Sequence, residues 1–176
     1  IKKTKKERKI FSQKPFFYIT KKINFKLTDD QINSLNEINN DLKSENKMFR
    51  LLQGDVGSGK TIVALISCLN TISSGFQVAF MAPTEILAKQ HYDLAKKLFN
   101  KNISIELLTS KIENKKKKEI LLNLGSQKIN LIIGTHSLFQ ERLSFKNLGL
   151  IIIDEQHKFG VKQRKKLSDK GGKNCD

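Results

Sequence analysis

The feature that most constrains the fold of this chain is a glycine-rich run, Gly-Asp-Val-Gly-Ser-Gly-Lys-Thr, at residues 54–61. The run fits the pattern G-x-x-x-x-G-K-[ST], in which a loop connects a β-strand to a helix. Residues 48–52 form a short apolar stretch that predicts the strand, and the apolar residues within 61–72 predict the helix. The sequence therefore predicts a strand–loop–helix unit of an α/β domain at this point of the chain.

Loops of this kind bind phosphate groups. Glycines let the loop curl so that consecutive backbone N–H groups point at phosphate oxygens, and the dipole of the following helix adds to the attraction. Lys60 is expected to reach the β- and γ-phosphates, and the Thr61 hydroxyl is expected to ligate Mg²⁺. A flexible turn is the alternative, but the elements predicted on both sides favour a nucleoside triphosphate. The residues expected to bind it are Gly54, Asp55, Val56, Gly57, Ser58, Gly59, Lys60 and Thr61.

Such a loop needs a second acid at the end of a buried strand. Leu150–Ile153 is a run of four apolar residues, and Asp154 and Glu155 follow it directly. Asp154 is expected to hold the Mg²⁺ shell, and Glu155 to orient or deprotonate the attacking water. An ordinary acidic strand end is the alternative, which the glycine loop disfavours. Together the two segments predict hydrolysis of ATP with Mg²⁺, with Lys60, Asp154 and Glu155 as catalytic residues.

From residue 28 onwards, predicted helices alternate with short strands. The helices are expected at 28–42, 61–72, 85–99 and 113–124, and the strands at 48–52, 77–81, 104–108, 131–133 and 148–153. The strands are continuous apolar runs, which is typical of strands buried on both faces. The pattern predicts an α/β fold with a mostly parallel central sheet and helices on both faces. Residues 1–22 are expected to form a basic linker or tail, and residues 23–176 the nucleotide-binding domain.

The charge of the chain is strongly positive, because 33 Lys and Arg residues against 17 Asp and Glu residues give a net charge of +16. Such a field favours anionic partners, nucleic acid first and acidic lipid second, although a lysine-rich proteome explains the excess equally well. Lys2–Lys9 either contacts duplex phosphate or forms a solvated linker. Lys115–Lys118 is expected to be a solvated helix face.

Cysteine spacing and hydropathy indicate the cellular environment expected for the chain. Cys68 and Cys175 match no metal or redox spacing, and a reducing, intracellular setting is expected. The longest apolar run, residues 62–69 with a break at Ser67, is far shorter than the ~20 residues of a membrane span, so no membrane partner is expected. Residue 1 is Ile rather than Met, and the chain is expected to be a piece of a longer protein.

Three further segments resemble helicase motifs. Thr28-x-x-Gln31 resembles the helicase Q motif, whose glutamine reads adenine, and it is also a capping box that starts a helix; both interpretations can hold. Ala82–Ala88 resembles helicase motif Ia, and Gly134-Thr135-His136 resembles a later motif that touches the nucleic-acid backbone. Thr84 and Thr135 each follow a predicted strand, where a hydroxyl either contacts phosphate or caps a helix.

Residues 50–61, 81–88 and 154–164 together resemble the RecG family of ATP-dependent DNA helicases, and the resemblance covers residues 23–172. It implies a P-loop NTPase, RecA-like fold and the first motor domain of a monomeric enzyme of the bacterial cytoplasm, which remodels branched or forked DNA in repair and recombination. The site residues that it adds are Gln31 for ATP, Gln156 for catalysis, His157 for coupling, and Pro83, Thr84, Gly134, Thr135 and His136 for nucleic acid. For His157, coupling to DNA or to a second motor domain has a structural histidine as its alternative.

The sequence departs from the RecG pattern at two positions, because Lys158 stands where the family usually has Arg, and Ser110 stands where a Gly usually follows Leu-Leu-Thr. The family's second RecA-like domain and wedge domain are outside these residues. We therefore expect the isolated chain to bind ATP weakly and to hydrolyse it slowly or not at all. Two alternatives stay open: the motor domain of a transcription-repair coupling translocase, and a stand-alone P-loop nucleotide-binding module. Ser58 and Gln156 favour RecG over the translocase.

Overall fold

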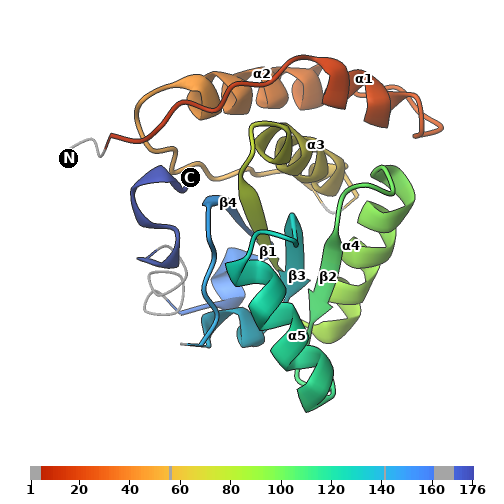
Figure 1. Ribbon diagram of the computed structural model, residues 1–176. Helices are drawn as coiled ribbons and strands as arrows, with labels where there is room; N and C mark the ends of the chain where they lie inside the picture. The colour runs from red at the N-terminus through yellow and green to blue at the C-terminus, as the bar shows by residue number, and fades with distance from the viewer. Residues whose placement is uncertain (1–4, 56, 141, 161–168) are drawn as a thin grey trace.

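The sheet at the centre of the molecule has four parallel strands in the computed structural model, which describes residues 5–55, 57–140, 142–160 and 169–176. The strands are β1 (Gln77–Met81), β2 (Ile105–Leu108), β3 (Leu131–Gly134) and β4 (Leu148–Ile153), in the order β2-β3-β1-β4 (Figure 1). Because all three pairings are parallel, the carboxyl ends of the strands meet at one edge of the sheet. Val56 of the glycine-rich run and residues 161–164 of the RecG-like stretch lie outside the described residues.

Helices cover both faces of the sheet, as predicted. They are α1 (Lys14–Thr20), α2 (Asp29–Lys43), α3 (Lys60–Ser73), α4 (Glu85–Leu98) and α5 (Asn114–Gly125), with short 3-10 helices η1 (His136–Phe139), η2 (Gln156–Lys158) and η3 (Gly172–Asn174). In Figure 1, α3 lies between the sheet and the layer formed by α1 and α2, and α4 lies beside β2. The helix α5 packs on the opposite face. Apart from one strand, the predicted elements agree with these bounds within two residues.

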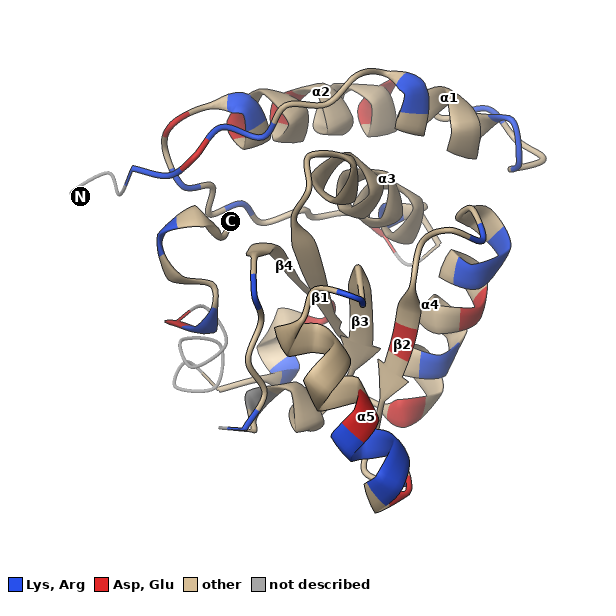
Figure 2. Ribbon diagram, viewed as in Figure 1, with Lys and Arg blue, Asp and Glu red and all other residues tan. Residues whose placement is uncertain are grey.

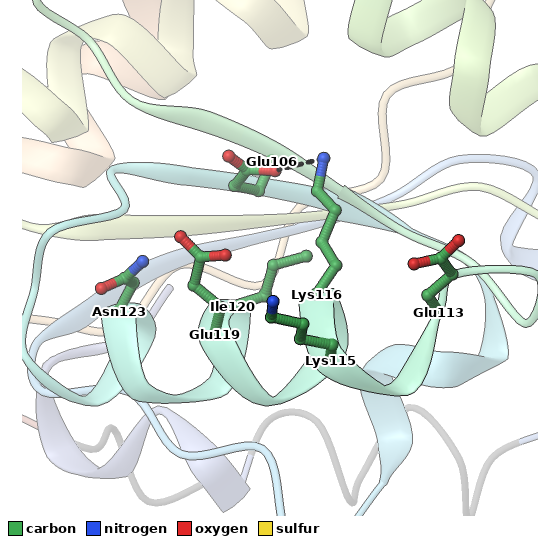
Figure 3. Close-up of a pocket in the computed structure, with 7 residues that line it drawn as sticks. All are labelled: Glu106, Glu113, Lys115, Lys116, Glu119, Ile120 and Asn123. Carbon is green, nitrogen blue, oxygen red and sulfur yellow. Dashed lines mark ion pairs between the residues drawn. The ribbon is translucent and has the colours of Figure 1, made fainter.

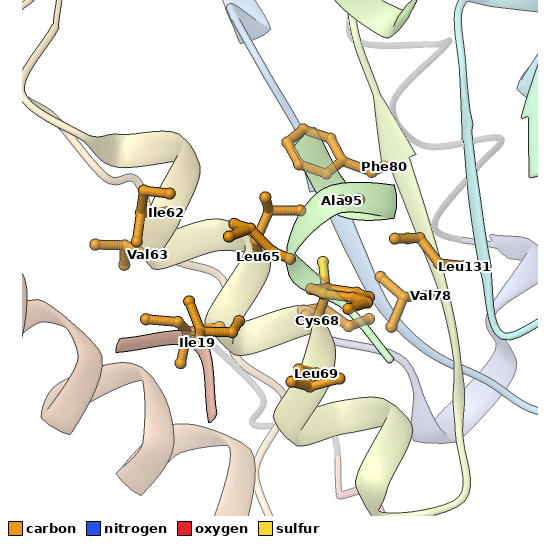
Figure 4. Packing of buried hydrophobic residues seen from close by; sticks show 14 of the residues in the cluster. Ile19, Ile62, Val63, Leu65, Cys68, Leu69, Val78, Phe80, Ala95 and Leu131 are labelled. Atoms are coloured by element: carbon orange, nitrogen blue, oxygen red, sulfur yellow. The ribbon is translucent and has the colours of Figure 1, made fainter. Parts of the chain in front are cut away.

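Two apolar layers result from the alternation of side chains along the strands. Val78 and Phe80 of β1 pack with buried side chains of α3 and α4, such as Leu65 (Figure 4). Ala79 and Met81 point to the other layer, where they meet α5. The central strands β1 and β3 are buried along their whole length, which confirms the two-sided covering that their apolar runs predict. The end of β4, which is an edge strand, is only half-buried.

Residues 48–52 do not form the predicted strand. Phe49 and Leu51 are 84% and 57% exposed, whereas Met48 and Leu52 are half-buried against the core, so only one side of this stretch is covered. Arg50 ties the segment to α2, because its guanidinium donates to the Asp41 carboxylate at 2.6 Å. The prediction was wrong because apolar content indicates a strand without identifying the strand edge with which it would pair.

The first described residues are packed against the domain. Lys6 and Lys9 are 7% and 0% exposed, and both ammonium groups donate to Asp176 Oδ2, at 2.7 and 2.6 Å. Asp176 also occupies the outer edge of β4, where Ile151 N donates to its carbonyl and its own N–H donates to Gly149 O. Burial lowers the pKa of the Lys9 ammonium, although the hydrogen bond to Asp176 opposes this shift. The solvated linker is therefore wrong for these two lysines, and the domain boundary at residues 22 and 23 stays a prediction.

Charged side chains lie mainly on the helices and the N-terminal segment, whereas the strands are almost free of them (Figure 2). Lys115, Lys116 and Lys118 of α5 are exposed and Lys117 is half-buried, in agreement with the predicted solvated face. Within the described residues, no helix combines the length and apolar character that crossing a membrane requires.

Candidate nucleotide-binding and catalytic site

The glycine-rich loop closes around the ammonium group of Lys60, the first residue of α3. Lys60 Nζ donates to the carbonyl oxygens of Gly54 and Asp55, at 2.6 and 2.7 Å. Gly59 has a φ of 77°, a left-handed conformation that favours glycine, and it directs the chain into the helix. The loop thereby brings a cation and the N-terminus of a 14-residue helix to one point. A lysine and a helix N-terminus that converge in this way suit a phosphate group.

Gln31 belongs to a capping box and also contacts the loop. Gln31 N donates to Thr28 Oγ1 at 3.3 Å, and Thr28 N donates to Gln31 Oε1 at 2.9 Å, which confirms the capping box. The amide nitrogen Nε2 of Gln31 has a further role, because it donates to Ser58 O at 2.8 Å. The start of α2 is thereby joined to the loop. Recognition of adenine by Gln31 stays a prediction.

A pocket of about 340 Å³ lies between the start of α2 and the loop. It is lined by Phe25, Lys26, Thr28, Gln31, Gly57, Ser58 and Gly59. Phe25 is 52% exposed, so its ring presents an apolar face beside the polar groups of Gln31 and the loop, a combination that suits a heterocyclic base. Sequence reasoning missed Phe25 and Lys26. The available signal was an aromatic residue three positions before the helix cap.

Asp154 is held from two sides at the end of β4. Its backbone N–H donates to Met81 O at 2.9 Å, and its Oδ2 lies 2.8 Å from Nε2 of His91. The hydrogen bond with His91 is the main cause that lowers the pKa of Asp154; burial opposes it, and the charge of Lys60 adds to the lowering. The carboxylate is therefore ionised at neutral pH and lies within the electrostatic field of the loop lysine. Sequence reasoning missed His91.

The residues after Asp154 turn sharply. Glu155 has φ 50° and ψ 52°, a left-handed conformation that is strained for a residue with a side chain. Its Oε2 lies 3.5 Å from His157 Nε2, and both side chains are exposed. Gln156 is half-buried at the start of η2. The roles of Glu155, Gln156 and His157 stay predictions, although an exposed carboxylate beside an ionised aspartate suits the activation of water.

The segments predicted to contact nucleic acid lie side by side at the carboxyl edge of the sheet. Met81 is opposite Gly134 in the register of β1 and β3, and Ala82 N donates to Gly134 O at 2.9 Å. Residues 82–84 and 134–136 therefore leave neighbouring strand ends together. Gly134 is tightly enclosed, because a methyl group at this position would overlap Leu108 O.

The two threonines of these segments differ. Thr84 is exposed and its Oγ1 accepts a hydrogen bond from Leu87 N at 3.2 Å, which confirms that it caps α4. Thr135 is 8% exposed, and its side chain makes no capping hydrogen bond to η1 in the part of the chain that is described, so the cap is wrong for this residue. Pro83 is half-buried and His136 is exposed. Contact of these side chains with nucleic acid stays a prediction.

Ser110, one of the two departures from the RecG pattern, ties the end of β2 to the first turn of α4. Its N–H and its hydroxyl both donate to Glu85 Oε1, at 3.2 and 2.6 Å. The Ser110 hydroxyl is the main cause that lowers the pKa of Glu85, and Lys111 adds to the lowering. The loop after β2 is therefore anchored beside Thr84, the cap of the same helix.

A second pocket of about 340 Å³ lies between β2 and α5 (Figure 3). It is lined by Glu106, Glu113, Lys115, Lys116, Glu119, Ile120 and Asn123. In Figure 3, Lys116 reaches across to Glu106, with 3.9 Å between Nζ and Oε2. This pocket shares no lining residue with the glycine loop, and its carboxylates would repel a phosphate. We therefore place the nucleotide at the loop.

Thr61 and Asp154 are the side chains that would hold Mg²⁺. The Asp154 side chain is 28% exposed and ionised, and Thr61 is half-buried in the first turn of α3. A carboxylate and a hydroxyl are hard oxygen ligands, which Mg²⁺ accepts while it keeps several waters and nucleotide phosphates. The donor set therefore fits Mg²⁺ that arrives with a nucleotide. Among the described residues, no group of three or more His, Cys, Asp or Glu side chains would hold a metal without it.

Comparison with known proteins gives consistent matches. Residues 28–174 match the family described as DEAD/DEAH box helicase. The chain is 50% identical over 165 residues to the ATP-dependent DNA helicase RecG of Bacillus subtilis (strain 168), a match that covers 93% of this chain and 24% of the relative. The chain thus spans about a quarter of the length of this curated relative.

Solved structures agree with these matches. A structure of RecG bound to a three-way DNA junction matches with a TM-score of 0.83 and 46% identity, over 89% of this chain and 22% of that chain. The crystal structure of a DEAD box protein from the hyperthermophile Methanococcus jannaschii has a TM-score of 0.69 and 23% identity, over 94% of this chain and 45% of that chain, and shares the fold. The predicted RecA-like α/β fold and the resemblance to RecG are confirmed. The chain belongs to the DEAD/DEAH box helicase family.

Proposed function

We propose that this chain is the ATP-binding motor domain of a DNA helicase that couples ATP hydrolysis to the remodelling of branched DNA, such as forks and junctions, in repair and recombination. The observation that carries the proposal is the position of the Lys60 ammonium, which the glycine loop holds at 2.6 and 2.7 Å from Gly54 O and Asp55 O at the N-terminus of α3, where a phosphate group would be attracted. The relatives favour the substrate, since they are RecG helicases and one of them is bound to a three-way DNA junction. They disfavour the transcription-repair coupling translocase and the stand-alone module.

The loop and the pocket divide the binding of ATP between them. Lys60 would exchange its contacts with Gly54 O and Asp55 O for the β- and γ-phosphates. The base would lie against Phe25, within reach of the Gln31 amide. These assignments account for the phosphates by charge and for the base by stacking and hydrogen bonding.

Hydrolysis requires a metal and an activated water. Mg²⁺, held by Thr61 and Asp154, would supply the positive charge that phosphoryl transfer needs. Glu155 would orient or deprotonate the attacking water from the turn after β4, with Gln156 beside it. His157, which lies 3.5 Å from Glu155, would couple this site to DNA or to a second motor domain.

DNA would contact the edge of the sheet where residues 82–84 and 134–136 lie side by side. Exposed Thr84 and His136 present a hydroxyl and an imidazole there, which suit the phosphate backbone. Pro83, Gly134 and Thr135 would shape this edge. The other partners that we propose are a second RecA-like domain and a wedge domain of one chain, in a monomer of the bacterial cytoplasm.

The ATPase rate of the protein encoded by the complete open reading frame tests this function. It is measured without nucleic acid and with single-stranded DNA, forked DNA and structured RNA. Forked DNA should raise the rate most strongly, and Glu155→Gln should lower it by about 100-fold or more, the size of a lost general base. A rate that no nucleic acid changes contradicts the motor, and a response to RNA alone contradicts DNA as the partner.

The isolated 176-residue chain gives a second test. It should bind ATP weakly and hydrolyse it slowly or not at all, because the proposed site is completed by a second domain. Sustained turnover that Lys60→Ala abolishes would contradict the need for that domain, while it would support the assignment of the loop.

A further inference from the structure

His91 is a buried histidine whose ring is fixed in place beside Asp154. It lies in the second turn of α4 and is 7% exposed. Its imidazole stacks on the ring of Phe80 in β1, with 4.8 Å between the centroids and an interplanar angle of 20°. In this orientation Nε2 lies 2.8 Å from Asp154 Oδ2. The packing of β1 and α4 thus aims one nitrogen at the carboxylate.

The direction of this hydrogen bond follows from the chemistry of the two side chains, because an aspartate side chain is ordinarily an ionised carboxylate at neutral pH. An ionised carboxylate only accepts hydrogen bonds, so Nε2 of His91 carries the hydrogen and donates it. The Asp154 backbone is already held by Met81 O. With Oδ2 also engaged, rotation of the carboxylate about its Cβ–Cγ bond is restricted, and the group keeps one orientation.

We propose that His91 is a positioning residue, whose Nε2–H orients the Asp154 carboxylate for the Mg²⁺ that accompanies ATP. The inference rests on the proposed function, and it adds a residue that none of the helicase-like segments contains. Hydrogen-bond partners of metal-binding side chains typically change metal affinity by about 10- to 100-fold when they are replaced. Removal of the His91 donor is expected to change the affinity for Mg²⁺ by this factor, although His91 contacts neither the metal nor the nucleotide.

The experiment measures binding of a fluorescent ATP analogue to the 176-residue chain, first in EDTA and then with increasing Mg²⁺. His91→Phe keeps a ring against Phe80 but removes the donor. We expect it to leave binding in EDTA unchanged and to raise the Mg²⁺ concentration at half-maximal enhancement by about 10-fold or more. His91→Gln returns an amide nitrogen to the place of Nε2, and it should restore most of the Mg²⁺ response.

Three further variants separate positioning from folding. Tyr92→Phe, the neighbouring position on α4, should match the unaltered chain. Asp154→Asn should lose the enhancement of nucleotide binding by Mg²⁺, so it shows the result expected when the carboxylate is absent. His91→Asn has an amide too short to reach Asp154, and it replaces His91→Phe in the comparison with His91→Gln if thermal melting shows that the phenylalanine variant does not fold.

Each outcome decides the inference. A higher Mg²⁺ requirement in His91→Phe or His91→Asn, restored in His91→Gln, supports it. It is overturned if a folded variant without the donor keeps the Mg²⁺ midpoint of the unaltered chain, if binding in EDTA falls by the same factor, or if Mg²⁺ has no effect on the unaltered chain. An unaltered chain that binds no nucleotide under any condition overturns the proposed function, and this inference with it.

Discussion

Replacement of Gly59 by alanine tests the contact between the glycine loop and α2. Gly57 and Gly59 have nearly the same positive φ, 83° and 77°, so we expect alanine to be strained by a similar amount at both positions. Their surroundings differ. A methyl group at Gly57 would meet no atom within 4 Å, whereas at Gly59 it would overlap Nε2 of Gln31. The pair of variants therefore separates backbone strain from loss of the Gln31 contact.

The expected magnitudes follow from these contacts. A left-handed alanine costs about 1–2 kcal/mol, of which about 0.4–1 kcal/mol is offset by the smaller entropy of its unfolded chain. Gly57→Ala should therefore lower the free energy of unfolding by about 1 kcal/mol. Gly59→Ala also displaces the flexible end of Gln31 and breaks its 2.8 Å hydrogen bond to Ser58 O, which adds about 1 kcal/mol. Its total cost should be about 2 kcal/mol.

Urea denaturation of the 176-residue chain, followed by circular dichroism, measures these differences. The third variant is Gln31→Ala, in which the overlap with a methyl group at Gly59 no longer exists. In that background Gly59→Ala should cost only as much as Gly57→Ala, so the double-mutant cycle should show a coupling of about 1 kcal/mol. Equal losses of unfolding free energy in the two glycine variants, or a coupling of zero, would refute the idea that the Gln31 side chain packs against Gly59 and stabilises the loop.

Other predictions concern charge and cysteine reactivity. The Asp154 pKa is lowered in the folded chain, so the ionised carboxylate stabilises the fold above a pH of about 4, and this contribution is lost as the pH falls through the lowered pKa. Urea denaturation at several pH values should therefore show that the free energy of unfolding of Asp154→Asn approaches that of the unaltered chain in acid. A difference that stays constant with pH contradicts this. Burial raises the pKa of the Cys68 thiol and raises that of Cys175 to about 12, so a disulfide reagent near neutral pH should label neither in the native chain and both in urea; rapid native labelling is the contrary result. Arg50→Met should lower the free energy of unfolding by about 0.5–1 kcal/mol through loss of the partly exposed pair with Asp41, and a loss that persists unchanged in molar salt would contradict an ionic cause.

Much of the fold could be predicted because local sequence and tertiary packing agree there. The apolar runs of β1 and β3 predict strands covered on both faces, and both are buried along their length. Thr28 and Gln31 have the spacing of a capping box, and α2 begins between them with both hydrogen bonds present. Residues 48–52 have a similar apolar content but form no strand, because pairing depends on a free strand edge. In the structure, Asp176 occupies the outer edge of β4, and Arg50 is bound to Asp41 of α2. Neither residue is part of the apolar pattern.

The candidate site also contains some residues that could be predicted from the sequence and others that could not. Lys60 and Asp154 could be predicted, because loop spacing and a strand end are visible along one stretch of sequence. His91 could not, since its position on α4 has the helical spacing of an ordinary core residue, and its partner lies 63 residues away in the chain. Lys6 and Lys9 were misplaced for the same reason: in a basic segment a lysine predicts exposure, and only the fold brings Asp176 to them.

The helix α4 has a mechanical consequence. Thr84 caps its first turn and His91 lies about 10 Å further along the axis, at a rise of about 1.5 Å per residue. Over so short a span a helix is stiff, so a displacement of the capped end is passed to Nε2 of His91 with little loss. A displacement of the first turn of α4 would therefore move His91, in the second turn of the same helix, together with its hydrogen bond to Asp154. The carboxylate that we propose for Mg²⁺ is thus linked through one helix to a residue at the surface.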